Sequence, residues 1–79
     1  MEEQLILEKL QKIFRDVFSS QSLNINPEMT ANDIDEWDSL SHMLLITQVE
    51  AAFSIKFKLK DLNKMRKIGD MIELIQSKL

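Results

Sequence analysis

The scarcity of glycine and proline constrains this chain most, because these two residues interrupt helices and mark turns. The sequence of 79 residues contains one Gly and one Pro. Runs of β-branched residues are few, and apolar residues recur at helical spacing. The pattern predicts an all-α fold, and a chain of this length makes at most one domain, residues 1–79.

The first predicted helix covers residues 2–19. Its apolar residues fall within an arc of about 100°, opposite charged residues, as in an amphipathic helix. The apolar residues are Ile6, Leu10, Ile13, Phe14 and Val17. Residues 19–38 follow without a sustained period and include the sole Pro27. They predict a long ordered loop, and a long loop in so small a domain is often functional.

The second predicted helix, residues 39–53, is apolar on two sides. A domain this small has core enough for one such face, so the other must cover a loop or remain exposed for docking. We favour docking. One face holds Leu45, Ile46, Val49 and Phe53, and the other holds Leu40, Met43 and Leu44.

The C-terminal part predicts two further helices. Residues 55–60 alternate apolar and Lys residues, but no second strand-like run exists to pair with them, so they predict an extended connector. Residues 59–65 predict a short helix, since Leu59, Leu62 and Met65 are spaced by three. Residues 68–79 predict an amphipathic last helix, in which Gly69 costs some stability. Its predicted apolar face consists of Ile68, Met71, Ile72, Ile75 and Leu79.

The charge is divided unevenly between the two halves of the chain. Residues 1–38 sum to −6 and residues 39–79 to +3, with a net charge of −3. This balance, without interleaved aromatic residues, argues against nucleic-acid binding. There is no Cys, so a disulfide, a thiol nucleophile and a Cys-based zinc site are excluded. The start lacks the basic segment of a signal peptide, so we expect a cytoplasmic protein.

The motif DIDEWDSLSHM stands where the loop meets the second helix. Asp38 is a preferred N-cap residue, which would place Ser39 at the first helical position. Unpaired backbone N–H groups and the helix dipole favour a phosphate there. The triplet Asp38, Ser39, Leu40, about 40 residues from each end, resembles the signature of the acyl carrier protein family.

This resemblance covers nearly the whole chain. It implies a four-helix bundle with a long loop between the first two helices and a short third helix. It also implies that a phosphopantetheinyl transferase attaches 4′-phosphopantetheine from coenzyme A to the Ser39 hydroxyl with Mg²⁺, which Asp38 helps to position. Asp38 and Leu40 flank the attachment residue. Acyl-loading and acyl-processing enzymes would be further partners of a monomeric carrier that is not itself an enzyme.

Other interpretations of the motif residues are weaker. Ser39 could be an ordinary first-turn serine of an unmodified helical interaction module. A calcium-binding loop of the EF-hand type that starts at Asp33 is excluded, because Asp38 and Leu44 stand where this pattern needs Gly and Glu. Trp37 is expected to anchor the loop, and its place near Ser39 lets it contact the arm or a partner. His42 lacks partners at metal or catalytic spacing, and we expect it to be partly buried near the acyl chain's path.

The sequence departs from housekeeping fatty-acid carriers, whose second and third helices are acidic. The second helix keeps only Glu50, and Lys residues occupy the third-helix region. We therefore expect a specialised carrier in a lipid, polyketide or secondary pathway, which docks through an apolar face with a basic edge. A D-alanyl or aminoacyl/peptidyl carrier is the alternative. The expected partner-binding residues are Trp37, Leu40, Met43, Leu44, Thr47, Lys58 and Lys60.

Overall fold

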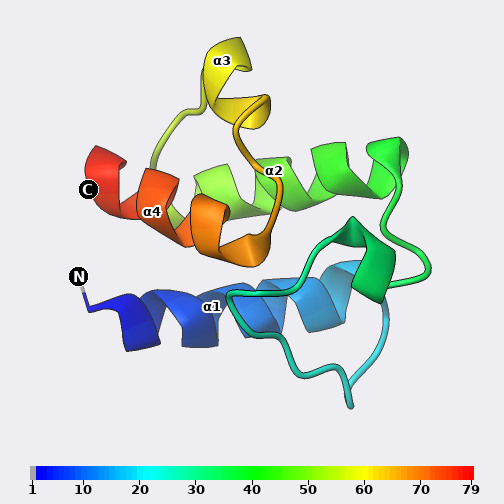
Figure 1. Cartoon of the computed structure of the whole chain (residues 1–79). Helices are drawn as coiled ribbons and strands as arrows, with labels where there is room; N and C mark the ends of the chain where they lie inside the picture. The colour runs from blue at the N-terminus through cyan, green and yellow to red at the C-terminus, as the bar shows by residue number, and fades with distance from the viewer. Residues whose placement is uncertain (1) are drawn as a thin grey trace.

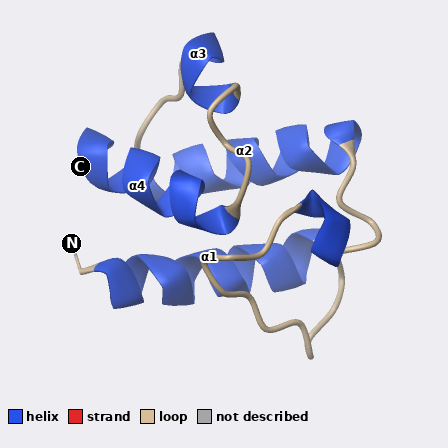
Figure 2. Ribbon diagram, viewed as in Figure 1, coloured by secondary structure: helices blue, strands red, loops and turns tan. Residues whose placement is uncertain are grey.

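A computed structural model describes residues 2–79, and the regular structure in this range is helical. The helices are α1 (Glu3–Val17), the 3-10 helix η1 (Ala31–Asp33), α2 (Ser39–Phe53), α3 (Leu59–Leu62) and α4 (Ile68–Lys78). In this range, β pairing is limited to one isolated bridge between Thr30 and Lys67. The predicted all-α fold is confirmed (Figures 1 and 2).

The core lies where α1, α2 and α4 meet. α1 and α2 lie side by side and run in opposite directions, and α4 packs against α1 (Figure 1). α1 contributes Ile6, Leu10 and Phe14 to this core as predicted. The buried face of α2 is the predicted one, made of Leu45, Ile46, Val49 and Phe53. α4 adds Ile68, Met71, Ile72 and Ile75.

α1 is slightly shorter than predicted, because it ends at Val17 rather than residue 19. Phe18 caps it, and its buried ring packs on Phe14 with ring centroids 5.9 Å apart. Ser19 then takes a left-handed backbone conformation, with φ of 50°. Such a residue ends a helix and turns the chain. The long loop therefore begins at a definite turn.

Side chains of α1 hold the first part of that loop. The Gln11 side-chain oxygen accepts the Ile25 backbone N–H at 3.0 Å. Arg15 Nε donates to the Leu23 carbonyl at 2.8 Å. The Arg15 guanidinium also donates to the Asn24 side chain at 2.9 Å. These bonds explain how a segment without hydrophobic periodicity is ordered, as predicted.

The middle of the loop is bound to the start of α4, and this contact gives Gly69 a role that the sequence did not reveal. The Gly69 N–H donates to the Pro27 carbonyl at 2.8 Å, and the Ile68 N–H donates to the Met29 carbonyl at 2.9 Å. A Cβ atom at Gly69 would lie 3.1 Å from the Pro27 oxygen. Gly69 therefore permits a close backbone approach, in addition to its helix-propensity cost.

The third helix is the element that the sequence predicted least well. Residues 55–58 form the expected extended connector, but α3 covers only Leu59–Leu62, whereas residues 59–65 were predicted. Leu59 is 77% exposed, so it does not belong to the buried side with Leu62. The short helix is held by Asp61, whose carboxylate accepts the Lys58 N–H at 2.8 Å and pairs with Lys78 Nζ at 2.9 Å.

None of the helices within residues 2–79 is long and apolar enough to cross a membrane.

Candidate functional site

The start of α2 is fixed by a reciprocal pair of hydrogen bonds between Asp38 and Ser41. The Asp38 carboxylate accepts the Ser41 N–H at 2.9 Å, and the Ser41 hydroxyl oxygen accepts the Asp38 N–H at 2.8 Å. The Ser41 hydroxyl also donates to the Glu36 carbonyl at 2.9 Å. The predicted N-cap, Asp38, is confirmed. Ser41 is a supporting residue that sequence reasoning missed.

Ser39 is the first residue of α2, and its side chain is exposed. At this position the backbone N–H groups and the dipole of a 15-residue helix favour a bound anion. The Ser41 N–H holds the pKa of the neighbouring Asp38 carboxyl below its usual value, so this carboxylate is charged at neutral pH. The serine hydroxyl is thus open to a partner and stands beside a fixed carboxylate.

A cleft of about 550 Å³ opens beside Ser39, between the start of α2 and the segment that follows α3. Met43 forms part of its α2 side, and Leu62 and Met65 form part of the other side. The cleft is therefore largely apolar, and Arg66 adds a cation to its wall. Its complete lining is Ala31, Trp37, Asp38, Ser39, His42, Met43, Leu62, Asn63, Met65 and Arg66.

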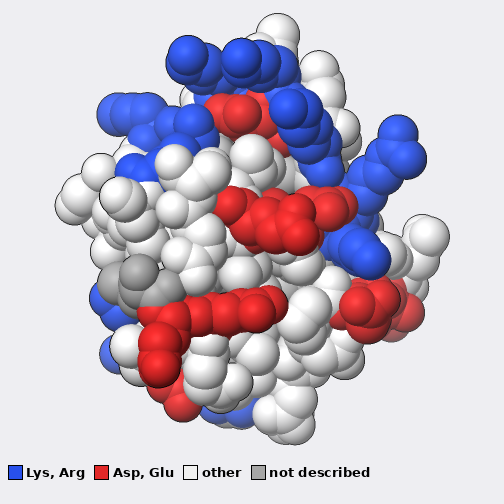
Figure 3. All heavy atoms as spheres, turned by 60° about the vertical axis from the view of Figure 1, so that its left-hand side comes forward, with Lys and Arg blue, Asp and Glu red and all other residues white. Residues whose placement is uncertain are grey.

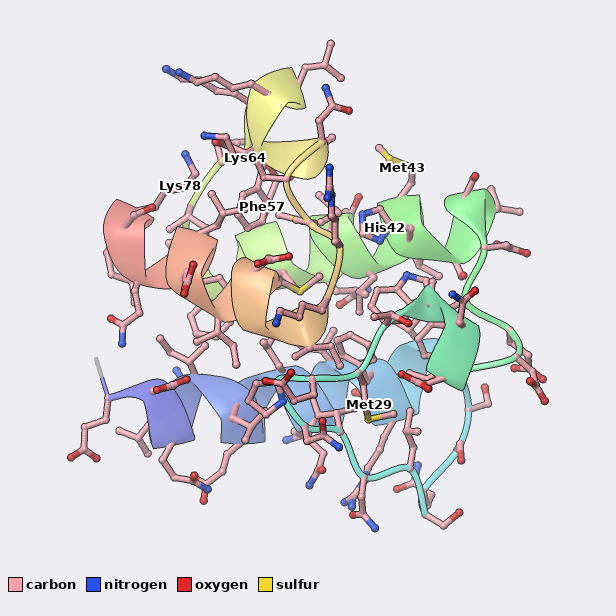
Figure 4. All side chains as sticks on the ribbon, in the orientation of Figure 1. Met29, His42, Met43, Phe57, Lys64 and Lys78 are labelled. Carbon is pink, nitrogen blue, oxygen red and sulfur yellow. The ribbon has the colours of Figure 1, made fainter. Side chains whose placement is uncertain are left out.

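The sequence could not place Leu62, Met65 and Arg66 at this site. The spacing of Leu62 and Met65 indicated an apolar side of a short helix. It did not indicate which part of the molecule that side would meet. The chain turns back after α3 and descends past α2 toward α4 (Figures 1 and 4), and Leu62, Met65 and Arg66 then line the same cleft as Ser39.

Trp37 anchors the loop end, as predicted. Its ring is partly buried and meets Phe14 edge to face, with centroids 5.2 Å apart. Its indole N–H donates to His42 Nδ1 at 3.1 Å, and these two rings stack at 6.0 Å. His42 is half-buried as expected, and burial lowers its pKa. The Trp37–His42 hydrogen bond is a contact that sequence reasoning missed.

The second apolar face of α2 is exposed, which is the alternative that we favoured over a face covered by a loop. Leu40 is 82% exposed, and Met43 and Leu44 are about half exposed, at 52% and 50%. These residues line a second hollow together with Thr47, whose hydroxyl donates to the Met43 carbonyl at 3.0 Å. The structure thus brings five predicted partner-binding residues to the Ser39 end of the molecule: Trp37, Leu40, Met43, Leu44 and Thr47.

Lys58 and Lys60 lie elsewhere, at the beginning of α3, and neither lines the Ser39 cleft. They belong to a group of cations that gathers over α3, at the top of Figure 3. We call the four lysines in and next to α3 the basic edge: Lys56, Lys58, Lys60 and Lys64. Asp61 lies among these cations and pairs with Lys78.

The acidic residues around Ser39 do not gather into a metal site. Across the described range, no group of three or more His, Cys, Asp or Glu side chains could hold a metal ion. The Asp38 carboxylate caps α2.

Comparison with known proteins identifies the family through a solved structure. No protein-family model matches the chain, and no curated protein sequence matches it. The solution NMR structure of a holo acyl carrier protein from Geobacter metallireducens is 46% identical to this chain. It superposes with a TM-score of 0.87, and the match covers 92% of this chain and 84% of that one. With this identity over nearly the full length, and with the four-helix arrangement described above, the chain belongs to the acyl carrier protein family.

Proposed function

We propose that Ser39 carries a covalent 4′-phosphopantetheine arm, on which acyl groups travel as thioesters between partner enzymes. The observation that supports this most is the position of Ser39, exposed at the first turn of α2 beside a largely apolar cleft. The phosphodiester would meet the N-terminal end of the helix dipole, which favours an anion. The arm would supply the thiol that the sequence lacks.

The attachment step needs little from this chain beyond presentation of the hydroxyl. The bond from Ser39 Oγ to phosphorus forms as the bond from phosphorus to the adenosine bisphosphate part of coenzyme A breaks. The hydroxyl proton passes to a base on the transferase. Asp38 is the nearest carboxylate along the chain and would help to orient a Mg²⁺ ion brought by the transferase, which would neutralise charge on the phosphates.

The carrier role follows from tethering. An acyl group on a flexible arm stays at high effective concentration near successive enzymes. The chain contributes the attachment point and the surfaces that partners recognise, in one carrier domain that acts as a monomer. We place this function in the cytoplasm, where coenzyme A is available to the transferase.

Intact mass spectrometry tests the attachment. The protein is incubated with coenzyme A, Mg²⁺ and a broad-specificity phosphopantetheinyl transferase. One added phosphopantetheine is expected for the wild type and none for Ser39→Ala. Ser41→Ala, which keeps the Ser39 hydroxyl, is the control and should still gain one arm. Failure to gain mass with several transferases would instead favour an unmodified interaction module.

We further propose that partners dock on the exposed face of α2 and that the basic edge selects partners with acidic surfaces. The α2 face offers Leu40, Met43, Leu44 and Thr47 around one hollow, with Trp37 beside it. Lys58 and Lys60, at the beginning of α3, belong to the basic edge. Charge complementarity steers encounter and rejects partners of the same sign. A specialised pathway, distinct from housekeeping fatty-acid synthesis, fits this charge pattern.

Charge reversal tests the selection of partners. Enzymes of a standard fatty-acid synthase, which recognise acidic carriers, should load the wild-type holo protein poorly. The double change Lys58→Glu and Lys60→Glu should raise their loading rate at low salt. The control reverses two cations on α1, Lys9→Glu and Lys12→Glu, and should leave the rate near that of the wild type. Efficient loading of the wild type by these enzymes would contradict the proposal.

A further inference from the structure

Trp37 and His42 join three elements around Ser39. The Trp37 ring packs against Phe14 of α1 at 5.2 Å and against Phe18 at 6.3 Å. On its other side it donates a hydrogen bond to His42 of α2 and stacks on that ring. Trp37 precedes the helix by two residues and His42 lies in its first turn, so the contact spans the attachment residue. Trp37, Ser39 and His42 all line the same cleft.

The direction of this hydrogen bond determines the protonation state of His42. An indole nitrogen can only donate, so His42 Nδ1 must accept, and the imidazole must be neutral with its proton on Nε2. A second proton would occupy Nδ1 and place two N–H groups against each other at 3.1 Å. The contact therefore exists only with neutral His42.

We propose that the Trp37–His42 contact positions the end of the loop and Ser39 for modification, and that protonation of His42 releases it. His42 is thus a positioning residue that acts on Ser39 through Trp37. This inference rests on the proposed function only through the modification of Ser39. The contact and its response to protons are properties of the unmodified chain.

The burial of His42 places this release below the ordinary pKa of a histidine. Burial lowers the pKa of His42 from its ordinary value of 6.5. The charged side chains that line the cleft with His42 are Asp38, from the loop end, and Arg66, from the segment after α3. The Asp38 carboxylate is held by the Ser41 N–H, and Arg66 adds positive charge. Burial favours the neutral ring, so this form is retained at pH 7 and protonation needs a pH below 6.5.

NMR of the apo protein tests the contact without any modification. The His42 ring should show the tautomer with its proton on Nε2. The Trp37 indole N–H signal should shift along the same titration curve as His42, with a midpoint below 6.5. An indole signal that does not change through the His42 titration would overturn the proposal.

Transfer rates of three variants test the positioning role. His42→Asn places an amide oxygen near the Nδ1 position and cannot titrate. The transfer rate of this variant should stay close to that of the wild type at pH 7.5. The wild-type rate divided by the rate of the variant should fall as the pH drops below 6.5. His42→Leu, which has no acceptor, and Trp37→Phe, which has no donor, should be slower at pH 7.5 by about fivefold, the factor for one lost hydrogen bond.

Division by the His42→Asn rate removes the pH dependence of the transferase itself. A constant ratio through the pH range in which NMR shows His42 to titrate, or equal rates for His42→Leu and His42→Asn, would refute the positioning role. Absence of any adduct on the wild type would refute the proposed function instead, and the NMR titration would still decide whether the contact exists.

Discussion

The hydroxyl of Ser41 and the carboxylate of Asp38 close the first turn of α2 from opposite directions, and Ser39 lies between them. The sequence predicted half of this arrangement. Asp is a preferred N-cap residue, whereas the usual reciprocal partner three residues later is Glu or Gln. Ser41 completes the pair because the chain turns so that its hydroxyl also reaches the Glu36 carbonyl. That third partner depends on the path of the loop.

Loss of the Ser41 hydroxyl should destabilise the fold. Ser41→Ala leaves the Asp38 N–H without its side-chain acceptor, which should lower the free energy of unfolding by about 1 kcal/mol. Chemical denaturation measures the difference. Ser77→Ala is the control, because the Ser77 hydroxyl bonds only to the Leu74 carbonyl near the end of α4. Equal stability of the two variants would contradict this role.

Asp61 should make stability sensitive to acid. The Lys58 N–H, and then the ion pair with Lys78, lower the pKa of the Asp61 carboxyl from 3.8. The unfolded chain therefore takes up this proton at a higher pH than the folded chain. The resulting stabilisation is complete above pH 3.8 and is lost as the pH falls through the lowered pKa.

Asp61→Asn should consequently be less stable than the wild type at pH 7, and the difference should shrink as the pH falls below 3.8. Thermal unfolding across this range measures both effects. Asp16→Asn, on the exposed side of α1, should follow the wild type closely. A stability difference between the wild type and Asp61→Asn that grows toward low pH would contradict the predicted direction of the pH dependence.

Among the elements, α2 was the best predicted and α3 the worst, for a physical reason. Fifteen residues give several turns of periodic pattern, and the two apolar faces of α2 emerge clearly from them. α3 has four residues, and three apolar residues spaced by three fit several local paths. Its position depends on Asp61, whose carboxylate accepts the Lys58 N–H at the start of α3 and pairs with Lys78 of α4. The last of these contacts is remote in sequence.

The two faces of α2 should respond differently to truncation. Leu45 is fully buried, so Leu45→Ala should cost about 2–5 kcal/mol in the free energy of unfolding. Leu40 is 82% exposed, so Leu40→Ala should change stability by about 0.5 kcal/mol or less. The second variant should instead weaken partner docking. A large stability loss in Leu40→Ala would mean that this face is structural.

Gly69 tests the contact between the loop and α4. Alanine usually favours a helix by about 1 kcal/mol over glycine. Here its Cβ would lie 3.1 Å from the Pro27 carbonyl oxygen, which also accepts the Gly69 N–H. Gly69→Ala should therefore lower the free energy of unfolding by about 1 kcal/mol. Gln76→Ala, at an exposed position of the same helix, should not. Stabilisation by Gly69→Ala would contradict the close contact.

At the scale of the whole molecule, the helical hydrophobic pattern predicted the core, whereas the path of the loop determined the site. α1, α2 and α4 bury most of the residues that the period selected, whereas Leu79 is 51% exposed because α4 ends at Lys78. The cleft, by contrast, joins loop residue Trp37 with His42 of α2 and with Met65 after α3. No local sequence pattern indicates that these three residues come together. The motif therefore predicted Ser39 as the attachment residue, whereas the residues that surround Ser39 could be identified only from the structure.

The central claim is that a single hydroxyl, at the first turn of α2, bears the arm. Peptide mass spectrometry of the protein isolated from its native cells tests it most directly. Fragmentation of the peptide that contains residues 38–42 separates Ser39 from Ser41. The account predicts one phosphopantetheine on Ser39 in a substantial part of the protein, with or without an acyl group on its thiol. An unmodified Ser39 throughout, or an arm on Ser41 instead, would contradict it.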